Sequence, residues 1–211
     1  MKKIYFIRHG ESEGNVGPIR QTGASSLSEK GKSQAKSVAK RCAKLSVDLI
    51  ISSSMNRATE TANIILEQVA KPIEYSDLFV ERRRPSEVLG KPKDSEMAQH
   101  AEKEIFEHFH ETGWRFSDEE NFDDLKERAR KALKYLAERS EENILVVTHG
   151  FFMRIIMAYI IFGDTLTGEE CTKCIRTFHM ENVGITVLVN DKENAKTPWW
   201  LWIWNDHAHL G

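Results

Sequence analysis

The chain has 211 residues, of which 40% are hydrophobic and 29% charged, and its formal net charge at pH 7 is −2. This balance predicts one soluble globular domain over residues 1–211 and excludes the overall positive field that attracts nucleic acid or an acidic membrane. No apolar run is long enough for a signal-peptide core or a membrane span, and three cysteines are too few for a disulfide framework, so we expect a cytoplasmic protein.

Apolar runs and helical stripes alternate along the chain. In chain order, the pattern predicts a strand (4–7), a helix (28–45), a strand (47–52), a helix (55–69), a strand (72–75), an irregular loop (77–94), two helices (95–111, 123–139), a strand (144–148), a buried helix (151–162) and two closing strands (184–190, 199–204).

This alternation is typical of the α/β class. We therefore expect a three-layer αβα fold with a mostly parallel central sheet. The segment from about 78 to 123 interrupts the rhythm between two predicted strands. It is expected to form a helical insertion, or lid, over the active-site edge of the sheet.

Cationic side chains follow three of the predicted strands. Arg8-His9-Gly10 comes after the first strand, Arg57 follows the second, and His149-Gly150 follows the fourth. The carboxyl ends of parallel strands share one edge of a sheet, so these groups are expected to converge. A cluster of two arginines and two histidines repels itself unless an anion is present, and a phosphoryl group suits it well.

The same residues suggest a mechanism. One histidine could attack phosphorus and hold it covalently, while the other cations stabilise the charge on the transferring oxygens. The leaving alcohol needs a proton, which a carboxylic acid with a raised pKa could supply. Glu81 begins the loop after the third strand and is the candidate acid. Of the adjacent Arg82, Arg83 and Arg84, at most one or two are expected to face the pocket.

Several motifs occur in an order that resembles the histidine phosphatase superfamily, the phosphoglycerate mutase-like fold. The resemblance extends from about residue 4 to residue 190. Its motifs are Ile7-Arg8-His9-Gly10-Glu11-Ser12-Glu13-Gly14-Asn15, Leu27-Ser28-Glu29-Lys30-Gly31 with Gln34-Ala35, Ser52-Ser53 with Arg57-Ala58 and Thr61-Ala62, Glu81-Arg82, Thr148-His149-Gly150, and Asn182 to Leu188.

The resemblance implies a role for each matching position. His9 would be the phosphorylated nucleophile and Glu81 the proton donor, with Glu87 as the alternative acid. The phosphate pocket would be completed by Arg8, Arg57 and His149. The substrate-binding residues would be Asn15, Arg82 and Gly150, the last through its backbone amide. The resemblance implies no metal and no organic cofactor. The lone Cys171-x-x-Cys174 pair lacks the second pair that a zinc site requires.

The expected activity is metal-independent hydrolysis of a phosphomonoester through a phosphohistidine. Glu81 is followed by Arg-Arg-Arg-Pro, without the Arg-His-Tyr-Gly and Gly-Leu-Asn-Lys stretches of the glycolytic mutases, which favours a phosphatase. The insertion could cover a small ligand, so a small phosphorylated metabolite is the expected partner. The alternatives are a phosphoglycerate-type mutase, a phosphatase acting on phosphohistidine in a protein, and a sensor of phosphorylated ligands with little turnover.

Overall fold

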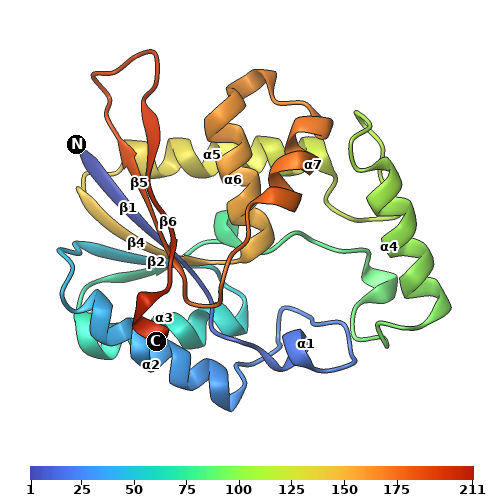
Figure 1. Cartoon of the computed structure of the whole chain (residues 1–211), viewed down its shortest axis with the longest axis horizontal. Helices are drawn as coiled ribbons and strands as arrows, with labels where there is room; N and C mark the ends of the chain where they lie inside the picture. The colour runs from blue at the N-terminus through green and yellow to red at the C-terminus, as the bar shows by residue number, and fades with distance from the viewer.

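A six-stranded sheet in the order β3-β2-β4-β1-β5-β6 forms the centre of the computed structural model, which describes all 211 residues (Figure 1). Strands β1 to β4 are parallel, β5 is antiparallel to β1, and β6 is antiparallel to β5. The strands are β1 Lys2–Arg8, β2 Leu49–Ser52, β3 Ile73–Tyr75, β4 Asn143–Thr148, β5 Ile185–Asn190 and β6 Trp199–Asp206.

Helices cover both faces of the sheet. They are α1 Glu13–Val16, α2 Glu29–Cys42, α3 Asn56–Val69, α4 Glu96–His108, α5 Phe122–Glu138, α6 Gly150–Phe162 and α7 Gly168–Thr177. In Figure 1, α2 and α3 lie on one side of the sheet and α5, α6 and α7 on the other. The predicted α/β fold with a mostly parallel sheet is therefore confirmed. The short α1 and the helix α7 are additions that the sequence pattern did not predict.

The central strand β1 shows why this sheet is buried on both faces. Ile4 and Phe6 pack into the apolar cluster beneath α5 and α6, whereas Tyr5 and Ile7 pack against α2 and α3. Successive side chains of a strand point to opposite faces, so a continuous apolar run suits a strand covered on both sides. The run ends at Arg8, where the chain leaves the core.

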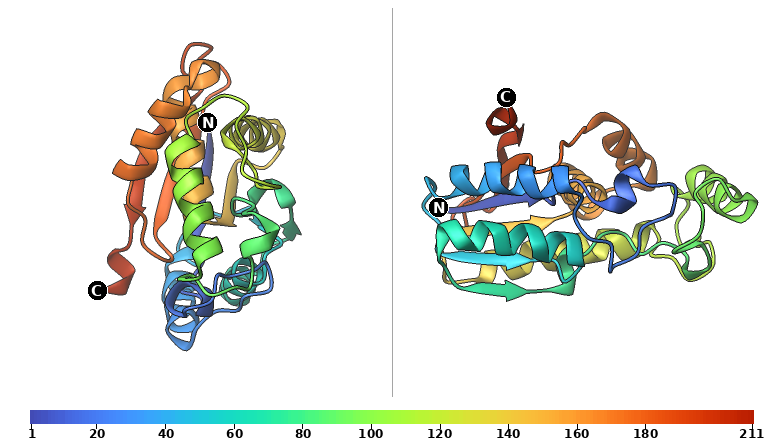
Figure 2. Two further views of the ribbon diagram at one scale, coloured as in Figure 1. Left: turned by 90° about the vertical axis from the view of Figure 1, so that its right-hand side faces the viewer. Right: turned by 90° about the horizontal axis from the view of Figure 1, so that it is seen from below.

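The segment between β3 and α5 extends beyond the sheet. It contains two short 3₁₀ turns, Asp77–Phe79 and Ser86–Val88, and the helix α4. Figures 1 and 2 show α4 at the opposite end of the molecule from the N-terminus. Ala98 and Ala101 of α4 form a small apolar cluster with Val88, separate from the two main clusters. None of the helices combines the length and apolar character needed to span a membrane.

Candidate active site

The carboxyl ends of β1 and β4 bring two histidines together. These strands are adjacent and parallel, and the backbone amide of His9 donates to the carbonyl of Thr148 at 2.9 Å. The ring centroids of His9 and His149 lie 5.0 Å apart, and the two residues are 2% and 0% exposed. Arg57, in the first turn of α3, places its Nε 3.2 Å from Nε2 of His9. The structure thus brings together three residues that the sequence placed at one sheet edge.

The hydrogen bonds of His9 orient its ring. Its Nδ1 lies 2.7 Å from the carbonyl of Gly10, which can only accept, so Nδ1 carries the proton and donates. The lone pair is therefore on Nε2, where it accepts from Arg57. Burial lowers the pKa of His9 well below 6.5, and the neighbouring His149 and Arg57 lower it further. The imidazole is neutral at pH 7, the form a nucleophile requires.

The backbone around His9 is fixed by close contacts. Asn182 donates from Nδ2 to the carbonyl of His9 at 2.8 Å. A Cβ on Gly10 would lie only 2.5 Å from the carbonyl oxygen of Gly31, so only glycine allows this approach of the loop to α2. The Gly10 amide donates to Oγ1 of Thr61 on α3. Two helices and the segment before β5 therefore hold the residue in place.

His149 is held by a serine side chain. Its Nε2 lies 2.7 Å from Oγ of Ser53, and that oxygen already accepts from the Met55 amide at 3.2 Å. The Ser53 hydroxyl can therefore hold the ring of His149 in place through Nε2. Nδ1 is buried and has no hydrogen-bond partner. Burial, followed by the charge of Arg57, lowers the pKa of His149 well below 6.5.

Arg8 provides a second donor without a partner. Its Nη1 donates to the carbonyl of Met180 at 2.5 Å, whereas its buried Nε has no partner. A Cβ on Gly150 would lie 3.1 Å from that Nε, so the guanidinium packs directly on the first residue of α6. Unpaired buried donors are rare in folded proteins. Arg8 contributes one here, close to the unpaired Nδ1 of His149, as expected of a site built to receive an anion.

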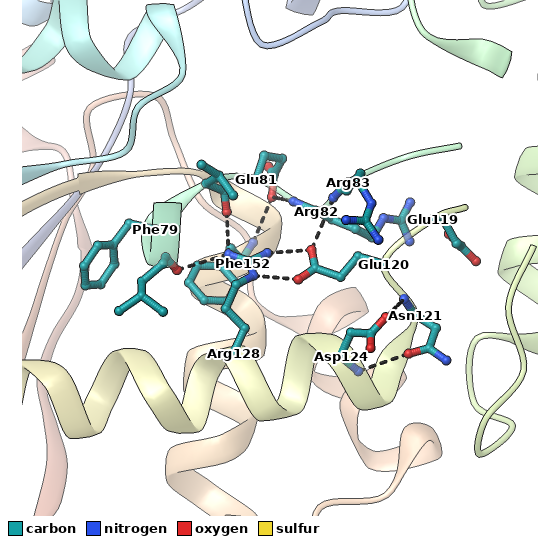
Figure 3. A network of polar contacts seen from close by, with 12 residues as sticks. Phe79, Glu81, Arg82, Arg83, Glu119, Glu120, Asn121, Asp124, Arg128 and Phe152 are labelled. Carbon is teal, nitrogen blue, oxygen red and sulfur yellow. Dashed lines mark hydrogen bonds and ion pairs between the residues drawn. The ribbon is translucent and has the colours of Figure 1, made fainter. Parts of the chain in front are cut away.

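Glu81 binds the N-terminus of α6 (Figure 3). Its Oε1 accepts from the amides of Arg82 and Phe152, each at 3.0 Å, and its Oε2 accepts from the Phe151 amide at 3.2 Å. Burial acts to raise the pKa of Glu81, but the amides and the charge of Arg57 outweigh it and lower the pKa. The expectation of a raised pKa for this acid is therefore wrong for the ligand-free protein.

A cavity of about 410 Å³ opens beside these groups. It is strongly cationic, and its lining includes Arg57, Glu81, Arg82, Arg83, Arg84, Glu120, Arg128, Gln21, Thr22 and Gly23. All three consecutive arginines line it, where we expected at most two. Their guanidinium groups have different partners, so the three side chains can lie at one cavity. Arg84 donates to Glu102, and Arg83 donates to the carbonyl of Asp118. The guanidinium of Arg82 lies over the Phe151 ring.

Several lining residues were not found from the sequence. Arg128 of α5 donates from Nε and Nη2 to the two carboxylate oxygens of Glu120, at 2.6 and 2.7 Å (Figure 3). Its guanidinium group also stacks on the Phe152 ring. It also donates to the carbonyls of Leu78 and Val80, which fixes the chain just before Glu81. No local pattern marks Arg128, because its partners are distant in the sequence.

Six residues named from the resemblance do not line the cavity: Arg8, His9, His149 and Gly150 lie beside it at the sheet edge, and Asn15 and Glu87 are placed elsewhere. The Oδ1 of Asn15 accepts from the Ser12 amide and closes the turn that begins α1. Glu87 is exposed on the turn Ser86–Val88. The structure contains no group of three or more His, Cys, Asp or Glu side chains arranged to hold a metal ion. Cys171 and Cys174 pack into the apolar core, and burial raises the pKa of Cys171 to about 12.

The fold is that of an α/β protein with two buried histidines and a cluster of arginines at the carboxyl edge of its sheet. Residues 4–203 match the histidine phosphatase superfamily (branch 1), and the chain belongs to that superfamily. Over 198 residues it is 28% identical to "Putative phosphoserine phosphatase 2" of Hydrogenobacter thermophilus, covering 92% of this chain and 93% of that protein.

Two further comparisons agree with this assignment. The chain is 29% identical over 174 residues to "Probable phosphoglycerate mutase GpmB" of Salmonella arizonae, covering 76% of this chain and 75% of that one. The solved structure "Bacillus stearothermophilus YhfR" superposes with a TM-score of 0.83 at 26% identity, covering 100% of both chains. The predicted family and the class of enzyme, a histidine phosphatase, are confirmed.

Proposed function

We propose that this protein hydrolyses small phosphomonoesters without a metal ion, through a covalent phosphohistidine on His9. The observation that carries the proposal is the neutral, buried imidazole of His9, whose Nε2 lone pair accepts from Arg57. The buried Nε of Arg8 and Nδ1 of His149, neither of which has a partner in the protein, support an anion-binding role for this position. Arginine guanidinium groups supply the positive charge that a metal ion provides in other phosphatases.

In the first step, Nε2 of His9 attacks phosphorus and the bond from phosphorus to the ester oxygen breaks. Arg57 moves its hydrogen bond from Nε2 to a phosphate oxygen, and Arg8, His149 and the Gly150 amide bind the others. The leaving oxygen takes a proton from the carboxyl group of Glu81. Although Glu81 is ionised in the free protein, a bound phosphate raises its pKa, because a nearby negative charge disfavours a second one.

In the second step, the Glu81 carboxylate accepts a proton from water. The water oxygen attacks phosphorus, the bond to Nε2 breaks, and inorganic phosphate leaves. The ionised form of Glu81 that the amides of α6 stabilise is the form this step requires. Glu81 is preferred to Glu87 as the acid because it lines the catalytic cavity.

A small substrate fits the dimensions of the site. His9 is only 2% exposed, and the cavity of about 410 Å³ beside it is covered by residues from the segment between β3 and α5. We propose that residues 78–123 act as a lid within one domain over residues 1–211. A cytoplasmic location is part of the proposal, supported by three free cysteines.

The proposal is tested by phosphate release from a panel of phosphorylated metabolites and an aryl phosphate. The panel includes 3-phosphoglycerate with a bisphosphate primer, followed by phosphorus NMR. We expect free phosphate to accumulate from several esters. Interconversion of phosphoglycerate isomers without phosphate release would instead indicate a mutase, the activity named for one group of relatives. Binding of esters without any turnover would contradict both.

A further inference from the structure

A second cavity lies beside the catalytic one, between α4, α6 and α7. Its volume is about 250 Å³, and it shares Arg82 and Arg84 with the catalytic cavity. The two spaces are therefore separated by side chains of the segment that follows Glu81. A group bound in the second cavity would therefore contact the same two arginines that border the catalytic cavity.

Arg82 is a buried cation without an acidic partner. It is 8% exposed, and its guanidinium lies 4.4 Å from the centre of the Phe151 ring rather than against a carboxylate. Burial lowers the pKa of Arg82 to about 10, and the charge of Arg84 adds to this effect. A buried charge normally has an ionic partner, because the loss of hydration is otherwise uncompensated.

The acidic groups around Arg82 form no ion pair with it. Glu102 pairs with Arg84 at 2.7 Å and with Arg20 at 3.0 Å. Glu119 is buried near Arg82 and forms no ion pair with it; its Oε2 has no hydrogen-bond partner, and burial raises the pKa of its carboxyl group. The carboxylate of Glu81 accepts hydrogen bonds from the amides of Phe151 and Phe152 in α6. Arg82 thus forms no ion pair within the protein, and an incoming anion can supply one.

The rest of the cavity combines aromatic walls with further cations. Phe106 of α4 is 63% exposed although it borders the cavity, and Arg176 of α7 lies 4.6 Å from the centre of its ring. Arg154 of α6 donates to the carbonyls of Gly150 and Ile175 and pairs with no carboxylate. Such a surface suits an apolar segment of a ligand that ends in a negative group.

We infer that the natural substrate carries, besides its reactive phosphate, an apolar segment and a second anionic group, and that Arg82 and the cavity between α4, α6 and α7 bind them. The inference rests on the proposed hydrolysis at His9 and adds the class of substrate. A carboxylate and a second phosphate can each bind a guanidinium group through two oxygens, so the inference applies to either anion.

The test uses synthetic phosphate esters of ω-hydroxy carboxylic acids with a graded number of methylene groups. Each is compared with its neutral primary amide and with the bisphosphate of the same chain length. The measured quantity is the ratio of kcat/KM for the anionic ester to that for the amide. At one chain length we expect a ratio of about tenfold or more in the wild type, as for a charged hydrogen bond. The carboxylate and bisphosphate arms then identify which anion is preferred.

Three variants test which arginine causes the preference for the anionic ester over its amide. Arg82→Met keeps an apolar stem over Phe151 and should reduce the ratio to about one. Arg176→Gln, at an exposed position, should reduce it severalfold. Arg130→Gln removes the same charge from an exposed Glu127 pair on α5 and should leave the ratio unchanged.

Each result has a defined meaning. A wild-type ratio near one, with both esters hydrolysed, would overturn the inference and leave the proposed hydrolysis intact. A high ratio that neither Arg82→Met nor Arg176→Gln lowers would overturn it as well. If no ester of either kind released phosphate, the proposed function itself would fail.

Discussion

The site has two halves that are built in opposite ways. The strand-end half consists of Arg8, His9, Arg57 and His149, which follow strands β1, β2 and β4. The insertion half consists of the residues between β3 and α5 that line the cavity. His9 and His149 are buried, and their rings and backbone are held by contacts from β4, α2, α3 and the chain before β5. In the insertion, Arg83 and Arg84 reach outward to partially exposed partners on the same segment. The reaction thus depends on the sheet, whereas substrate choice depends on a peripheral segment that can vary without disturbing it.

The largest expected effect lies in the strand-end half. His9→Ala removes the proposed nucleophile and should lower kcat by about 10⁴-fold or more, measured as phosphate release from an aryl phosphate. His179→Ala, which changes an exposed histidine, is the control and should retain wild-type turnover. If His9→Ala kept wild-type kcat, the assignment of the nucleophile would be wrong.

The boundary between the two halves is tested at Glu81. Glu81→Gln should lower kcat by about 10²- to 10⁴-fold on an alkyl phosphate, and less on an aryl phosphate, whose leaving group needs less help from an acid. The exposed Glu87→Gln serves as the matched control. A larger loss in Glu87→Gln than in Glu81→Gln would transfer the acid role to Glu87. Thermal unfolding of both variants separates loss of the α6 contacts from loss of chemistry.

Burial of the two histidines predicts a pH dependence of stability. Both have a pKa well below 6.5 in the folded state, so the unfolded chain binds more protons as the pH falls below that value. The free energy of unfolding should therefore decrease on acidification from pH 7 to pH 5.5, by up to about 1.4 kcal/mol per pH unit for each imidazole. Urea unfolding of His9→Asn should show a shallower slope. An unchanged slope would contradict the neutral, buried state of His9.

A smaller effect is expected from crowding Arg8. Gly150→Ala places a methyl group 3.1 Å from Nε of Arg8 and should displace the guanidinium by a few tenths of an ångström. We expect about a tenfold loss in kcat/KM with little change in melting temperature, because small misplacements of a charged donor weaken transition-state binding. A variant with full activity would show that Arg8 does not contact the phosphate.

The smallest expected effect comes from chelation. Because arginines provide the positive charge in the proposed mechanism, EDTA should leave phosphate release unchanged over a long incubation. A loss of activity that is restored by added divalent cations would point to a metal phosphatase instead.

The sequence predicted most of the fold because the elements that form it have strong patterns. The apolar residues of β1, which end at Ile7, are buried on both faces of the sheet. In α2, α3 and α5, the apolar residues that recur at helical spacing are the ones that are buried. Helix α7 was missed because its buried side is narrow and includes little besides Cys171 and Cys174. Helix α1 has only four residues, too few to show a helical period.

The candidate site was predicted where it depends on strand ends and missed where it depends on tertiary packing. His9 and His149 converge because parallel neighbours share an edge. By contrast, the position of Arg128 follows from its pairing with Glu120 and its stacking on Phe152, which no local pattern shows. Asn15 was expected near the substrate, but its side chain serves the turn before α1.

The central claim is that phosphate passes through His9. Rapid mixing of the enzyme with a labelled phosphomonoester, followed by quenching at alkaline pH and peptide mass spectrometry, tests it directly. The account predicts a phosphoryl group on the peptide that contains His9, stable in alkali, lost in acid and absent from His9→Ala. Full turnover with no labelled peptide, or with the label on another residue, would contradict it.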